Sequence, residues 1–114
     1  MAPSPAAPAA APQPPSLAEQ IALGERTYQR TCSPCHTIDG SPRIGPSWRG
    51  IWDTDVSLAD GRVVRVDAAY VRHSILQPNA DFVAGYPQGV MPTFAGMLAE
   101  SQIDGVIAFI ASLR

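Results

Sequence analysis

Two cysteines and a histidine in close succession constrain this chain more than any other feature. They stand in the stretch Cys32-Ser33-Pro34-Cys35-His36. C-x-x-C-H is typical of covalent c-type haem attachment, in which each thiol forms a thioether with one vinyl group of the same porphyrin. The imidazole after the second thiol is then held below the iron, where it can serve as an axial ligand. The pattern predicts Cys32 and Cys35 as covalent anchors and His36 as the proximal ligand.

Three other kinds of site share this cysteine spacing. A thioredoxin-like redox pair needs a βαβ context, which the surrounding sequence does not indicate. A zinc site needs further Cys or His ligands, and His73 is the one remaining candidate. A structural disulfide is the simplest alternative in an exported protein. The context of the motif favours haem over all three.

Size and charge limit the possible functions. The chain has 114 residues, enough for one domain, which we expect over residues 16–114. A covalently held apolar cofactor would supply buried surface that so small a domain lacks. The formal net charge is −2 and all eight basic residues are arginines. Nucleic-acid binding is therefore not expected.

Residues 1–15 are rich in proline and alanine, with half of the twelve prolines and no charge. This composition predicts a disordered but semi-rigid linker. The sequence has neither an apolar run long enough to span a membrane nor a signal-peptide pattern. Because haem is normally attached to C-x-x-C-H outside the cytoplasmic membrane, we expect the domain on the exported side. Met1 is then not expected to be the native start.

Two helices are predicted at the ends of the domain. Ser16 and Glu19 form a capping box, after which apolar residues follow a helical period. Gly24 falls within that apolar face, which predicts that another helix crosses closely there. Ser101 gives a second capping signal, followed by an apolar stripe to the C-terminus that places Phe109 near Gly24.

A shorter helix and a hairpin are predicted between them. Asp67 is the expected N-cap of a helix over residues 68–76, which Gln77-Pro78 ends. Residues 56–58 and 63–66 flank an Asp-Gly pair, a pattern typical of a small β-hairpin.

The sixth iron ligand should come from Met91, Met97 or His73. Met91 is favoured because it lies on a non-helical loop, where the fixed backbone around Pro92 can present its thioether. Met97 is more typical of a core filler, and His73 of a solvated histidine in mid-helix. Ligation by Met and His suits an electron carrier of high reduction potential.

Other residues are expected to wall the pocket or orient the ligands. A backbone carbonyl at Gly45-Pro46 can accept the Nδ1–H of the proximal imidazole. Trp48 and Trp52 offer apolar faces and an N–H each, although Trp52 is as readily an ordinary core aromatic. Arg43 could neutralise a haem propionate or remain a solvated charge. Tyr86 and Phe94, near Met91, are the candidates for closing the other side of the haem pocket.

Together these motifs resemble the class I cytochrome c family. The resemblance rests on Gly24-x-x-x-Tyr28-x-x-x-Cys32-x-x-Cys35-His36, on Gly45-Pro46-x-x-x-Gly50, and on Met91-Pro92-x-Phe94 before a C-terminal helix. It implies an all-α fold of three main helices around one haem c, here with a small β-hairpin inserted. It also implies that the Pro46 carbonyl holds His36 and that Gly24 and Phe109 form a helix crossing.

A narrower resemblance is to the cytochrome c domain fused to subunit II of caa-type haem–copper oxidases. It is carried by residues 56–61, 70–80 and 85–92. It implies a dicopper (CuA) acceptor in the same subunit, an upstream donor protein, anchoring through the parent subunit and a monomeric isolated domain. Many relatives have Gly-Arg where this chain has Asp53-Thr54, and that arginine usually contacts a propionate.

The expected function is one-electron transfer rather than enzymatic catalysis. Two alternatives remain open: a free-standing soluble cytochrome c shuttle, and a haem enzyme or gas sensor with an open sixth position. Between Asn79 and Ala99 only Asp81 is charged. Docking is therefore expected to depend on apolar contact more than on electrostatic steering.

Overall fold

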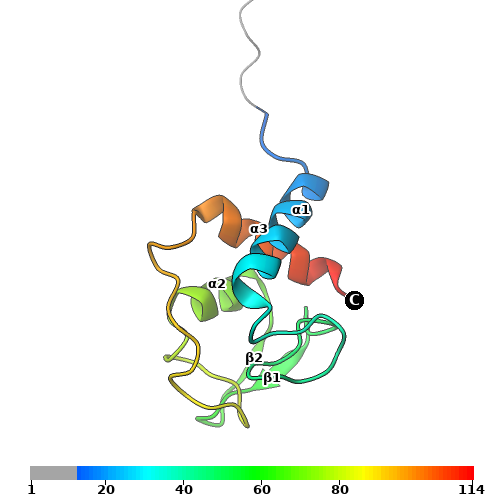
Figure 1. Ribbon diagram of the computed structural model, residues 1–114. Helices are drawn as coiled ribbons and strands as arrows, with labels where there is room; N and C mark the ends of the chain where they lie inside the picture. Colours follow the sequence, from blue (N-terminus) through cyan, green and yellow to red (C-terminus); the bar gives the residue numbers. More distant parts are fainter. Residues whose placement is uncertain (1–12) are drawn as a thin grey trace, which may run out of the picture.

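The computed structural model describes residues 13–114, and in that range the chain forms three α-helices, one π-helical turn and a two-stranded sheet (Figure 1). Most of the linker predicted at residues 1–15 lies outside the described residues. The helix-dominated architecture with a small hairpin agrees with the expectation. The elements in chain order are α1 (Leu17–Thr27), η1 (Tyr28–Cys32), β1 (Asp55–Ser57), β2 (Val63–Arg65), α2 (Ala68–Leu76) and α3 (Glu100–Ser112).

Two helices begin where their capping residues predict. The Ser16 Oγ accepts a hydrogen bond from the Glu19 N–H at 3.1 Å, so the capping box of α1 is confirmed. Asp67 caps α2 by accepting from the Tyr70 N–H at 2.8 Å. Each side chain satisfies an N–H that has no partner within its own helix.

The predicted start of the last helix is wrong. α3 begins at Glu100, so Ser101 lies inside its first turn. The side chain of Gln102 reaches back and accepts the Ala99 N–H at 2.8 Å. This hydrogen bond stabilises the start of the helix, so no capping hydroxyl is needed. Ser101 therefore does not act as the N-cap.

Helices α1 and α3 cross in close backbone contact. A Cβ added at Gly24 would lie 1.9 Å from the carbonyl oxygen of Gly105 and 2.8 Å from the Cβ of Phe109. A Cβ at Gly105 would lie 2.9 Å from the backbone nitrogen of Gly24. The predicted packing of Gly24 near Phe109 is confirmed, but Gly105, which the sequence reasoning overlooked, is the closer partner.

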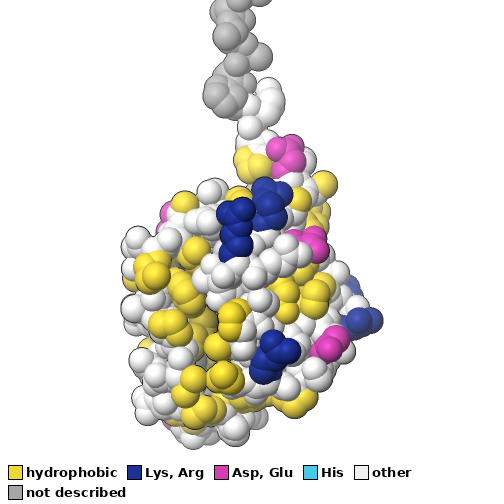
Figure 2. All heavy atoms as spheres, viewed as in Figure 1, with side chains coloured by type: hydrophobic (Ala, Val, Ile, Leu, Met, Phe, Trp, Pro, Cys, Tyr) yellow, Lys and Arg dark blue, Asp and Glu magenta, His cyan; other side chains and the backbone are white. Residues whose placement is uncertain are grey.

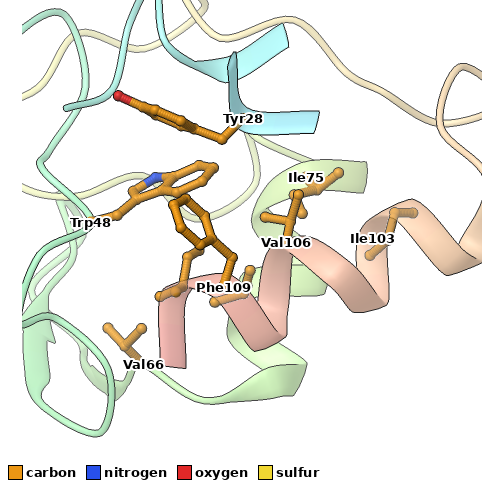
Figure 3. Close-up of a cluster of buried hydrophobic side chains, with 9 residues drawn as sticks. Tyr28, Trp48, Val66, Ile75, Ile103, Val106 and Phe109 are labelled. Carbon is orange, nitrogen blue, oxygen red and sulfur yellow. The ribbon is translucent and has the colours of Figure 1, made fainter. Parts of the chain in front are cut away.

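An aromatic cluster joins this crossing to the middle of the chain (Figure 3). The ring centroid of Trp48 lies 5.1 Å from that of Tyr28 and 6.3 Å from that of Phe109. Val66, Ile103 and Val106 belong to the same hydrophobic cluster and are almost completely buried. The core therefore fixes the loop that carries Trp48 against α1 and α3.

The hairpin and the segment after α2 complete the fold. In the hairpin Val56 pairs with Val64, and the strands lie within one residue of the predicted positions. Residues 77–99 then cross from α2 to α3 without a regular helix or strand pairing beyond one bridge between Leu58 and Val83. The Thr93 hydroxyl donates to the Leu76 carbonyl at 2.7 Å and fixes this crossing segment to the end of α2. No helix among residues 13–114 is both long and apolar enough to cross a membrane.

Candidate functional site

The cysteine motif follows a widened helical turn. Where α1 ends, the chain forms the π turn η1, closed by a hydrogen bond from the Ser33 N–H to the Tyr28 carbonyl at 2.8 Å. The Cys35 and His36 N–H groups then both donate to the Cys32 carbonyl, at 3.1 and 3.0 Å. This compact turn brings both thiols and the imidazole within one short segment.

Both cysteines are free thiols and partly buried. Burial, with a further contribution from neighbouring Cys35, raises the pKa of the Cys32 thiol to about 11. The thiol is therefore protonated at neutral pH. Within residues 13–114 no group of three or more His, Cys, Asp or Glu side chains is arranged to hold a metal ion, as a zinc site would require.

The orientation of His36 is fixed from two sides. Its Nδ1 lies 2.8 Å from the Pro46 carbonyl oxygen, the hydrogen bond that the resemblance implies. A Cβ at Gly45 would lie 2.4 Å from Cε1 of the same ring, so only glycine leaves the imidazole in place. Burial lowers the pKa of His36 despite the opposing effect of the Pro46 carbonyl. The ring is therefore neutral, with Nε2 free to act as a ligand.

His36 and Met91 line the same cavity. The cavity has a volume of about 140 Å³ and opens to solvent on one side. Its walls come from the motif, the loop of Trp48, α2, α3 and the crossing segment. Of the predicted site residues, those in the lining are Cys35, His36, Pro46, Trp48, Tyr86 and Met91.

Three predicted pocket residues are placed elsewhere. Arg43 is exposed and donates to the Ser33 carbonyl at 2.9 Å, which holds its guanidinium outside the cavity lining. Trp52 packs against the core and lines a separate shallow groove beside α2 and α3. Phe94 also packs against the core rather than lining the cavity. In this structure these three residues therefore lie outside the cavity lining, and their predicted contacts with the cofactor stay predictions.

The two rival iron ligands also lie outside the cavity lining. Met97 is 71 % exposed. His73 faces Asp81, with Nε2 3.2 Å from a carboxylate oxygen. Among the three candidates for the sixth ligand, only Met91 lines the cavity that His36 also lines.

The polar groups of the cavity indicate what fits there. Ser74 Oγ is the one buried side-chain polar atom in the described range without a hydrogen bond of normal geometry, and Ser74 lines the cavity. Its hydroxyl lies near enough to the Tyr70 phenol to offset part of the pKa rise that burial causes there. An apolar cavity with a thioether, a neutral imidazole and a spare hydroxyl suits a large, mainly apolar cofactor such as haem.

The expected propionate arginine has no counterpart in the cavity wall. Asp53 has φ 60°, a left-handed backbone conformation that glycine adopts most readily. The Arg65 guanidinium donates to the Asp53 carbonyl at 2.8 Å, and the Thr54 hydroxyl to the Ile51 carbonyl at 2.6 Å. No arginine of residues 13–114 lines the cavity, and Asp81 is the one carboxylate that does.

Sequence reasoning missed much of the apolar wall. The residues concerned lie on the inner faces of two helices, and their helical spacing was the available signal. Such spacing marks an apolar helix face but does not separate core packing from cofactor contact. They are Val71, Ile75, Val106 and Ile110.

One comparison with known proteins gives a match. The family model described as "Cytochrome C oxidase, cbb3-type, subunit III" matches residues 19–110. This range includes the C-x-x-C-H motif, Gly45-Pro46 and Met91-Pro92. A search of curated proteins gives no match.

Proposed function

This chain belongs to the cytochrome c family that the matching model describes, and on that premise we propose that Cys32 and Cys35 hold its haem while His36 and Met91 ligate the iron. Domains of this family bind covalent haem c and serve in electron transfer, generally without catalysis, and are typically exported. The site residues and the partner protein are our proposal.

The observation that supports this ligand pair is the shared cavity of His36 and Met91. The Pro46 carbonyl fixes the imidazole, and Gly45 leaves room for it. Thr93, two residues after Met91, is hydrogen bonded to the end of α2, so the Met loop has a fixed position. Both proposed ligands are therefore positioned by contacts with other parts of the fold.

When bound, haem supplies reversible one-electron chemistry at its iron. The two thioethers would prevent its dissociation, and His36 and Met91 would keep the coordination the same in both states. With a thioether and an imidazole as its protein ligands, the haem would favour the ferrous form and have a raised reduction potential. The apolar wall limits solvent rearrangement around the cofactor.

The axial ligand can be tested with two matched methionine variants. Met91→Ala is expected to abolish the far-red Met–iron absorption band of the ferric protein and to let the ferrous protein bind carbon monoxide. Met97→Ala, on the same segment but exposed, should keep the band and exclude carbon monoxide. Carbon monoxide binding by the unaltered protein would instead favour the haem enzyme or gas sensor.

For the partner, we propose the CuA centre of a caa-type oxidase, in the same subunit II as this domain. Residues 56–61, 70–80 and 85–92 support this assignment by their resemblance to that domain. Residues 1–15 would link the two domains, so the haem would lie on the exported side of the membrane, anchored through the parent subunit. An upstream donor protein would reduce the haem.

The surface near the cavity suits a weakly charged partner. Hydrophobic side chains gather on the side of the molecule where the crossing segment runs (Figure 2). Ile44 and Val90 line the cavity and are also exposed, which places apolar side chains at its mouth. Such a patch favours docking by short-range contact.

The size and location of the native protein test the oxidase assignment. Membrane and soluble fractions of the source cells would be separated on a denaturing gel and stained for covalent haem. A membrane band several times heavier than this 12.1 kDa chain is expected. A small soluble band would favour the free-standing shuttle, leaving the haem site unchanged.

A further inference from the structure

The crossing segment passes the end of α2 before it reaches α3, and it is attached there on both sides of Met91 (Figure 1). Before Met91, the Gly89 N–H donates to the side-chain oxygen Oδ1 of Asn79 at 2.9 Å. After Met91, the Thr93 hydroxyl donates to the Leu76 carbonyl at 2.7 Å. Met91 is the middle residue between these two attachments, so its position follows from theirs.

The attachment after Met91 uses the last carbonyl groups of α2. Carbonyls at a helix C-terminus have no partner within their own helix. Here the Thr93 hydroxyl donates to the Leu76 carbonyl, and the Phe94 N–H donates to the Ile75 carbonyl at 3.1 Å. Two hydrogen bonds to one helix end therefore hold the chain just after the methionine.

The attachment before Met91 depends mainly on one side chain. Asn79 follows the end of α2, and its Oδ1 accepts the Gly89 N–H. The Gln88 amide adds a longer contact, with its Nε2 3.4 Å from the Asn79 carbonyl oxygen. Loss of the Asn79 side-chain oxygen would therefore free the segment before Met91, while the chain after it stays attached.

This weaker attachment lies in the wall of the cavity. Asn79 and Gly89 both line the cavity that His36 and Met91 line. Asn79 and Gly89 are also exposed on the surface of the molecule. The hydrogen bond between them therefore joins two parts of the chain that separate the cavity from solvent.

We propose that Asn79 is a positioning residue for Met91, which holds the sixth iron ligand in place and so excludes small competing ligands. The inference rests on the proposed function, because it requires Met91 to ligate a bound haem. Release of Gly89 lets the chain before Met91 move while Thr93 stays attached to α2. A competing ligand can then replace the methionine: the bond from its sulfur to iron breaks, a bond from the new ligand forms, and no electron is transferred.

The size of the effect follows from the strength of one hydrogen bond. A net contribution typical of a single hydrogen bond changes an equilibrium by about fivefold. A competing ligand binds only those molecules in which Met91 has left the iron, so its apparent affinity rises in proportion to that small fraction. Loss of the Asn79 oxygen should therefore raise this affinity about fivefold.

Imidazole binding by the ferric, haem-loaded domain tests the proposal. It is followed by the loss of the far-red Met–iron band at about pH 8, where free imidazole is mostly neutral. Asn79→Leu keeps a side chain of similar shape without the acceptor, and should bind imidazole about fivefold more tightly than the unaltered protein. Asn79→Asp keeps an oxygen that can accept the Gly89 N–H, and should bind imidazole as weakly as the unaltered protein.

Two further variants separate positioning from a general loss of stability. Gln77→Leu changes an exposed amide at the same end of α2, outside the cavity lining, and should leave imidazole affinity unchanged. Thr93→Val removes one of the two hydrogen bonds after Met91, so its effect should be smaller than that of Asn79→Leu. Equal imidazole affinities in Asn79→Leu and Asn79→Asp, or in Asn79→Leu and Gln77→Leu, would overturn the proposal.

Amide hydrogen exchange gives a readout that does not depend on ligand binding. In Asn79→Leu the Gly89 amide should exchange faster than in the unaltered protein, because it has lost its acceptor. The Phe94 amide should keep its rate, since its bond to the Ile75 carbonyl remains. Faster exchange at both amides would mean that the whole segment has loosened, and would contradict release on one side of Met91.

The proposed function and this inference fail in different ways. If Met91 does not ligate the iron, the unaltered ferric protein has no far-red Met–iron band. If Met91 ligates the iron but Asn79 does not position it, the band is present and Asn79→Leu binds imidazole no more tightly than the unaltered protein.

Discussion

At the scale of single residues, the site depends on the space that Gly45 leaves. The imidazole of His36 occupies the volume where any other side chain at position 45 would begin. The neighbouring carbonyl of Pro46 then fixes the ring by its hydrogen bond to Nδ1. One missing methyl group and one carbonyl thus orient the proposed proximal ligand.

Gly45→Ala should therefore disturb iron ligation. The new Cβ would lie 2.4 Å from His36 Cε1 and 2.8 Å from Nδ1, so the ring must move. We expect a lower yield of covalent haem and, in the haem-bearing fraction, an altered low-spin spectrum. Absorption and magnetic resonance spectra measure both. Ser41→Ala, exposed in the same loop, is the control and should behave like the unaltered protein.

At the scale of the elements, the crossing of α1 and α3 positions the rest of the fold. The two helices meet backbone to backbone at Gly24 and Gly105. Tyr28 follows one turn later, as the first residue of η1, and packs against Trp48, whose loop carries Pro46. A change in the distance between the two helices would thus be transmitted to the candidate site through the aromatic cluster.

Gly24→Ala should destabilise this protein, although a Gly→Ala change in an exposed helix usually stabilises. In an exposed helix interior the change would stabilise by about 1 kcal/mol. Here the Cβ would lie 1.9 Å from the Gly105 carbonyl oxygen. Overpacking of this kind costs about 1–3 kcal/mol, so we expect a lower free energy of unfolding in denaturant titrations.

Gly105→Ala is the graded comparison for that experiment. Its Cβ would lie 2.9 Å from the Gly24 nitrogen and 3.0 Å from the Gln20 carbonyl oxygen, which are milder contacts. Its loss of stability should be smaller than that of Gly24→Ala. Equal stability of both variants and the unaltered protein would mean that the helices are not in close contact.

The sequence predicts those elements whose signals are local. Ser16 and Asp67 mark helix starts because each caps the chain three residues away. The start of α3 depends instead on Gln102 reaching back to Ala99, which an apparent cap at Ser101 obscures. Gly105 could not be paired with Gly24 because no local pattern reports which face of a distant helix approaches.

The difference between local signals and contacts of distant segments also applies to the candidate site. Cys32, Cys35 and His36 stand in one motif, and Met91 is marked by the proline that follows it. Arg43 could be placed only by knowing that the Ser33 carbonyl binds its guanidinium. Cavity lining depends on the relative placement of segments far apart in the chain, which composition and periodicity do not report.

At the scale of the whole molecule, the cavity lies at the centre of a small domain. Its walls come from α2 and α3, together with the loops before and after them. A domain of this size buries a limited fraction of its surface. The haem is therefore expected to be part of the core rather than an addition to a finished fold.

Removing the attachment sites tests this dependence. Cys32→Ala with Cys35→Ala should give an exported chain with reduced near-ultraviolet circular dichroism and a broad, weakly cooperative thermal transition. The helix signal in the far ultraviolet should be retained to a larger extent than the near-ultraviolet signal, since α1 and α3 still pack directly against each other. A sharp transition at the temperature found for the haem-bearing protein would contradict this expectation.

The sparse charge of the crossing segment predicts how the molecule meets its acceptor. Asp81 is the only charge between Asn79 and Ala99, and it forms an ion pair with Arg62. The rate of electron transfer to a CuA domain should therefore change little between low and moderate salt. Stopped-flow mixing over a salt series measures this, and a steep fall in rate would indicate electrostatic steering instead.

The π turn at Tyr28–Cys32 determines where this helix can lose a residue. A π turn holds one residue more than an α turn within about the same rotation, whereas each residue of an α-helix advances it by about 100°. Deleting Gln29 would let the Ser33 N–H keep its bond to the Tyr28 carbonyl in ordinary α geometry. The two thiols would then keep nearly the same direction relative to α1. A single deletion should thus be tolerated in the π turn far better than within α1, where it would turn the thiols by about 100°.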